Sequence, residues 1–137
     1  MDNKTLIREA LLARKKSYSP YSNYAVGAAL LCEDGTVVTG CNIENVGYSA
    51  TNCAERTAFF KAISEGKDRF TKIAIVGGEK GKPIDNYAYP CGICRQVMRE
   101  FCDPASFIVI VAKNEDDYVE KTLEEFLPMS FGPDRLL

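Results

Sequence analysis

Residues 26–41 read VGAALLCEDGTVVTGC, and this stretch decides the fold class. Two apolar runs at 26–32 and 36–41 are joined by Glu-Asp-Gly, a turn sequence that favours a β-hairpin. Helical and strand patterns alternate after the hairpin, so the antiparallel pair is expected to join further strands through helical crossovers. The stretch therefore predicts an α/β protein with a mixed sheet.

Working outward, the spacing of apolar residues predicts an amphipathic helix over 4–16 and a loop over 17–23 before the hairpin. After a polar loop at 42–52, further helices are predicted over 53–65 and 91–102. The later elements are strands at 72–76 and 107–112, a short strand at 118–120, and a short helix at 122–127. The acidic run at 115–117 is expected to be a solvated turn.

The order α-β-β-α-β-α-β fits one domain spanning residues 1–137, with the sheet covered by helices. The net charge of −2 gives no basic surface for nucleic acid or an anionic membrane. No segment is apolar and long enough to cross a bilayer, and the N-terminus lacks the apolar core of a signal peptide. These features predict a cytoplasmic protein that acts on a small neutral molecule.

The chain has six cysteines and no histidine. The absence of histidine excludes Ser–His and Cys–His nucleophile pairs and zinc sites that use imidazole. In a reducing cytoplasm, cysteines are better interpreted as metal ligands or buried side chains than as disulfides. We expect Cys32, Cys41 and Cys102 to be small buried hydrophobic residues.

The other three cysteines stand at the starts of two predicted helices. The triplet CAE at 53–55 opens one helix, and PCGIC at 90–94 opens the next. Three thiolates can fill three corners of a zinc tetrahedron and leave the fourth for water, which is the catalytic form of a zinc site. The helix dipole also stabilises a thiolate at a helix start. The sequence thus predicts one zinc ion held by Cys53, Cys91 and Cys94.

Glu55 follows Cys53 by two positions, which on an ideal helix turns its side chain about 200° away. Both residues can face one metal only if Cys53 caps the helix and the helix end points at the metal. We therefore expect two helix N-termini to converge, with Glu55 above the open coordination position as a proton carrier. Arg56 is expected to reach the thiolates and offset their charge.

These motifs resemble the small, homotetrameric type of cytidine deaminase. The resemblance runs along nearly the whole chain and includes YSNYAVGAAL at 21–30, GCNIEN at 40–45, CAERTA at 53–58 and CRQV at 94–97. It implies a five-stranded mixed sheet between helices, one zinc per chain, and uridine and ammonia as products of pyrimidine salvage. It also implies a homotetramer with shared active sites.

The resemblance further assigns roles to individual residues. Asn42 and Glu44 match the pair that holds the ribose hydroxyls, although both residue types are also common in solvated turns. Tyr24 stands where the family usually has a phenylalanine that stacks on the pyrimidine, and it can equally be a core aromatic. The backbone of Ala54 is expected to meet the base. Phe131 matches an aromatic residue that a neighbouring subunit contributes.

Other interpretations stay open at this point. A deaminase of another small cytosine compound, such as blasticidin S, would share the zinc motifs, and residues 42–45 favour the nucleoside. A non-catalytic zinc-binding module is a third possibility, which the open coordination position and Glu55 disfavour. A lone CxxC can also be a redox pair or half of a structural zinc site, but neither requires CAE at the preceding helix start.

Overall fold

The predicted hairpin is present in the computed structural model, which describes all residues 1–137. Strand β1 (Tyr24–Cys32) pairs antiparallel with β2 (Val37–Cys41). The connecting turn contains Gly35 at a φ of +92°, a backbone conformation that glycine adopts at no steric cost. The helix preceding the hairpin is α1 (Asn3–Arg14), close to its predicted limits.

The sheet has five strands in the order β2-β1-β3-β4-β5. Strand β3 (Phe70–Glu79) runs antiparallel to β1 and parallel to β4 (Ile108–Asn114). Strand β5 (Asp117–Thr122) pairs antiparallel with β4. The prediction of a mixed sheet is confirmed. It contains more antiparallel pairing than expected, because β1 pairs antiparallel on both sides and β4 and β5 form a second hairpin.

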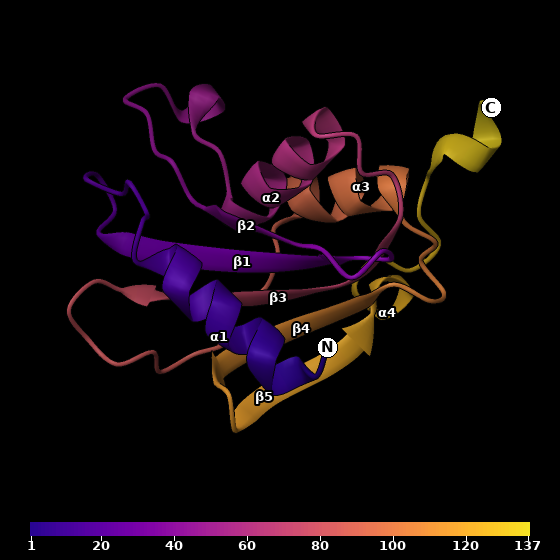
Figure 1. Cartoon of the computed structure of the whole chain (residues 1–137). Helices are drawn as coiled ribbons and strands as arrows, with labels where there is room; N and C mark the ends of the chain where they lie inside the picture. The colour runs from indigo at the N-terminus through magenta and orange to yellow at the C-terminus, as the bar shows by residue number, and fades with distance from the viewer.

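Helices cover both faces of the sheet (Figure 1). Helix α1 packs on one face, where Leu6 and Ile7 meet Ala29 and Leu31 of β1. Helices α2 (Ala54–Ser64) and α3 (Gly92–Phe101) pack on the other face. The alternation of side chains along a strand sends neighbouring residues of β1 to opposite helical layers. None of the helices is both long and apolar enough to cross a membrane.

The chain ends on the side of α2 and α3. A short helix α4 (Leu123–Phe126) follows β5, and the tail then runs past α3 to a 3-10 turn at Pro133–Arg135 (Figure 1). Another 3-10 turn, Tyr48–Ala50, lies in the long loop between β2 and α2.

The predicted end of β3 was wrong. The strand was predicted to end at residue 76, but Gly77 and Gly78 continue it and pair with Val26 and Ala25 of β1. The space above Gly77 is already filled, because a Cβ there would lie 2.9 Å from the Cβ of Ala88 and 3.1 Å from Cε1 of Tyr24. Glycine in this strand therefore marks a close approach of neighbouring side chains.

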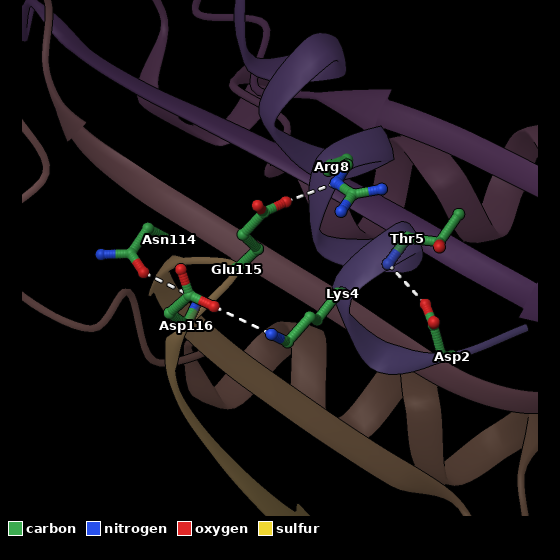
Figure 2. A network of polar contacts seen from close by, with 7 residues as sticks. All are labelled: Asp2, Lys4, Thr5, Arg8, Asn114, Glu115 and Asp116. Carbon is green, nitrogen blue, oxygen red and sulfur yellow. Dashed lines mark hydrogen bonds and ion pairs between the residues drawn. The ribbon is translucent and has the colours of Figure 1, made fainter.

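The acidic turn between β4 and β5 is not simply solvated. It binds the first turns of α1, as Figure 2 shows: Lys4 Nζ lies 2.9 Å from Asp116 Oδ1, and Arg8 pairs with Glu115. Asp2 caps the same helix by accepting a hydrogen bond of 2.8 Å from the Thr5 backbone N–H (Figure 2). These contacts fasten α1 to the far edge of the sheet.

Candidate active site

Two helix N-termini converge on the predicted metal site. Cys53 is the N-cap of α2 and Cys91 is the N-cap of α3, each with an extended backbone and a side chain that makes no capping bond. Cys94 lies in the first turns of α3 and is fully buried. The inference that Cys53 must be a cap is confirmed, and both thiol groups stand at the positive end of a helix dipole.

The three sulfur atoms have the spacing of a metal site. All lie within 4.8 Å of one another, and Sγ of Cys53 is 3.9 Å from Sγ of Cys91. Zinc–sulfur bonds of about 2.3 Å in a tetrahedron would separate the sulfur atoms by about 3.8 Å. The donor set therefore fits a zinc ion, with three thiols from the protein and one position left over.

The side chain of Arg56 supplies a positive charge to this cluster. Its Nη2 donates a hydrogen bond of 3.3 Å to Sγ of Cys53, and its Nε is buried without a hydrogen-bond partner. Hydrogen bonds from Cys94 and Arg56 lower the pKa of the Cys53 thiol to about 5. Cys94, which donates to that thiolate and is buried, has a raised pKa when no metal is bound. The cluster thus holds a thiolate at neutral pH.

Glu55 is the buried acid of the site, with only 4% of its surface exposed. Burial raises its pKa to about 7, and the negative charge of Cys53 adds to this effect. A carboxyl group with such a pKa can both accept and donate a proton near neutral pH.

A cavity of about 400 Å³ opens onto Glu55, Cys53 and Cys91. Its volume suits a small organic ligand. It brings together three of the residues expected to contact substrate, Tyr24, Asn42 and Ala54. The Tyr24 side chain is partly exposed there, and its hydroxyl makes no hydrogen bond within the chain, while burial raises its pKa.

Asn42 is a buried structural residue as well as a pocket residue. Its Oδ1 accepts hydrogen bonds from the Val26 N–H at 2.9 Å and from Ser17 Oγ at 2.5 Å. Its Nδ2 donates to the Tyr24 carbonyl at 2.8 Å. An amide nitrogen carries two N–H groups, so one remains for a ligand. The alternative that Asn42 is a residue of a solvated turn is therefore wrong.

Glu44 and Phe131 lie outside this cavity. The Glu44 carboxylate accepts from the backbone N–H groups of Tyr21 and Ser22 and lines an adjoining cavity, which shares Thr51 with the first. Phe131 is 61% exposed on the C-terminal tail, where its carbonyl accepts a hydrogen bond of 2.9 Å from Gln96 Nε2. Within one chain, Phe131 is not among the residues that line the pocket.

Sequence reasoning missed part of the pocket wall. Tyr87, Ala88 and Tyr89 line the cavity from the loop between β3 and α3. Their position directly before the PCGIC motif was the available signal, because residues that lead into a metal ligand must pass close to the site.

The chain is similar to known proteins along almost its entire length. The model of the cytidine and deoxycytidylate deaminase zinc-binding region matches residues 1–111. A cytidine deaminase from Sporosarcina psychrophila is 49% identical over 136 residues, which cover 99% of this chain and 96% of the relative. One from Halalkalibacterium halodurans is 50% identical, with 96% and 95% covered.

The chain also resembles a protein whose crystal structure is known. The cytidine deaminase of Burkholderia pseudomallei superimposes with a TM-score of 0.85 at 43% identity, covering 96% of this chain and 100% of that one.

Proposed function

Since this chain belongs to the cytidine and deoxycytidylate deaminase family, we propose that it hydrolyses cytidine, and also deoxycytidine, to the uracil nucleoside and ammonia. The observation that carries the proposal is the placement of buried Glu55 in the pocket where three cysteine thiols converge. One zinc ion per chain is held by Cys53, Cys91 and Cys94. When bound, zinc supplies a Lewis acid that makes water a better nucleophile.

The proton transfers belong to Glu55. Hydrolysis forms a bond from a water oxygen to C4 of the pyrimidine and breaks the bond between C4 and the amino nitrogen. Glu55 takes a proton from the water and delivers it to N3, which makes C4 more electrophilic. It then takes the second proton from the oxygen now bound to C4 and delivers it to the amino nitrogen, so that ammonia leaves and the oxygen stays on C4 as the carbonyl.

The remaining pocket groups bind the nucleoside. Asn42 donates a hydrogen bond from its free N–H to a ribose hydroxyl. Glu44, at the adjoining cavity, accepts a hydrogen bond from a ribose hydroxyl. Tyr24 presents its ring to the base. Ala54 is the first residue of α2, so its backbone N–H has no partner within the helix and can meet the base.

The proposal includes a homotetramer with shared active sites. Apolar side chains on the outer faces of α2 and α3 support it, because Phe60 is 47% exposed and Ile93 62% exposed beside a groove of about 430 Å³. Phe131 then reaches the active site of a neighbouring chain. Mixed oligomers of Phe131→Ala and Glu55→Gln chains should recover activity that neither variant has alone. No recovery in confirmed mixed oligomers would exclude this role.

We place the reaction in pyrimidine salvage in the cytoplasm. All six cysteines are unpaired in the structure, which suits a reducing compartment.

An ultraviolet assay of cytidine deamination, run beside metal analysis, tests the function. Wild-type protein should turn over cytidine and contain about one zinc per chain, and free cytosine and blasticidin S should be poor substrates. Cys53→Ala, Cys91→Ala and Cys94→Ala should each lose zinc and activity. Cys32→Ala and Cys102→Ala are the matched controls and should keep both. Zinc binding without deamination would instead identify a non-catalytic module.

A further inference from the structure

Tyr87 forms part of the cavity wall and is held in place by contacts outside the pocket. Tyr87 lies in the loop between β3 and α3, and its ring lines the cavity together with Tyr24 and Glu55. Its hydroxyl points to a different element, where it donates a hydrogen bond of 2.5 Å to Oδ1 of Asp117 at the start of β5. One side chain therefore connects the pocket to the β4–β5 hairpin.

Lys113, near the end of β4, contacts both Tyr87 and Asp117. Its Nζ lies 4.9 Å from the centre of the Tyr87 ring and 3.8 Å from Oδ2 of Asp117. The lysine thus contacts the ring as a cation over an aromatic face and also pairs with the carboxylate that holds the hydroxyl. The ring is fixed by two kinds of contact from one hairpin.

The surrounding loop packs against the core through Ile84 and Ala88 but makes few other hydrogen bonds to the rest of the chain. Among residues 83–89, Tyr87 alone forms a hydrogen bond with another secondary-structure element. The same loop carries Ala88 and Tyr89 into the pocket wall and leads directly to Cys91. Because β3 and β4 are parallel, their carboxyl ends lie at the same edge of the sheet, so the hairpin is next to the loop. The bond to Asp117 is therefore the hydrogen bond that ties this wall to the sheet.

We propose that Tyr87 contacts the substrate as a wall of the pocket, and that Asp117 and Lys113 are positioning residues that act through it. The inference rests on the proposed function, since it takes this cavity as the nucleoside site. A flat heterocycle fits between aromatic walls, and Tyr24 and Tyr87 supply two of them. Neither positioning residue lines the cavity, so their effect on substrate binding must pass through the tyrosine ring.

The test is a double-mutant cycle of Tyr87→Phe and Asp117→Ala, since an asparagine at position 117 would still accept the tyrosine hydrogen bond. Each single variant should raise KM for cytidine about 10-fold, the loss expected for a charge-assisted hydrogen bond, with kcat and zinc content unchanged. The double variant should be no worse than either single variant, because both remove the same contact. Lys113→Met should raise KM in the same direction. Asp116→Ala is the matched control, since Asp116 lies one residue away and binds Lys4 instead.

A second readout separates this inference from the function on which it rests. Calorimetric titration of cytidine into Glu55→Gln protein, with and without Tyr87→Phe, measures the contribution of Tyr87 to cytidine affinity in the absence of turnover. An active wild type whose KM does not change in Tyr87→Phe and Asp117→Ala would overturn the inference and leave the function standing. A lower melting temperature with unchanged KM, or effects that multiply in the double variant, would also overturn it. If the protein neither binds nor deaminates cytidine, both fail.

Discussion

The guanidinium of Arg56 lies 3.3 Å from Sγ of Cys53, one helical turn further along α2. Three thiolates around a divalent cation leave a net charge of −1, which weakens the cation as a Lewis acid. We expect Arg56 to withdraw part of that charge, with the two helix N-termini assisting it.

Replacement of Arg56 tests this compensation. Arg56→Gln should lower kcat/KM for cytidine about 10- to 100-fold, the usual range for a residue that supports a metal ligand. The comparison is made on samples whose zinc content has been measured and found equal. Arg69→Gln, at an exposed arginine, is the control and should have wild-type kinetics. Equal kinetics of Arg56→Gln and wild type at equal zinc content would remove Arg56 from the catalytic arrangement.

Replacement of Asn42 should lower the stability of the protein as well as its affinity for cytidine. Asn42→Ala leaves the Val26 N–H and the Tyr24 carbonyl without their partners, both of them part-buried contacts. We expect a loss of about 1–3 kcal/mol in the free energy of unfolding, measured by urea denaturation, besides a higher KM.

Glu44→Gln is the natural comparison for Asn42. The Glu44 side chain is only half-buried and keeps an acceptor oxygen as an amide, so this variant should raise KM with little change in unfolding. Equal stability of Asn42→Ala and wild type would show that its three hydrogen bonds within the chain are dispensable.

Gly40 sets the distance between β2 and α2. A Cβ at this position would lie 2.5 Å from the Ala54 carbonyl oxygen and 2.5 Å from the Ala58 nitrogen, both of them backbone atoms. Gly40→Ala should therefore push the start of α2, with Cys53, away from the sheet. We predict a loss of about 1–3 kcal/mol in stability and a lower zinc content.

Gly47→Ala provides the control for this prediction. Its new Cβ would meet nothing closer than 3.4 Å, so stability and zinc content should stay at the wild-type level. A Gly40→Ala protein with full zinc and normal unfolding would contradict the role of that close approach.

Local chemistry was enough to predict the centre of the site. The spacing of Cys53 and Glu55 is incompatible with both facing one metal from the side of a helix, and the structure shows Cys53 as a cap. The order of helices and strands was predictable for a similar reason, since apolar spacing reports which face each element buries. The end of β3 was not, because Gly77 and Gly78 also favour turns, and only the packing of Gly77 against Ala88 and of Gly78 against Ile84 explains them.

The outer parts of the pocket depend on contacts between distant segments. Tyr87 and Asp117 are 30 positions apart, and nothing near either residue in sequence signals the hydrogen bond between them. The buried role of Asn42 likewise arises from its meeting with Ser17 and the start of β1. Such contacts are set by tertiary structure and leave no local pattern.

The most direct test of the account is the turnover of cytidine by Glu55→Gln. The amide keeps the size of the carboxyl group and cannot carry a proton between water, N3 and the amino nitrogen. We predict that the variant keeps its zinc, its fold and its affinity for cytidine in calorimetry, while kcat falls about 10²- to 10⁴-fold. A kcat close to that of the wild type would contradict the assignment of Glu55 as the proton carrier, and with it the mechanism.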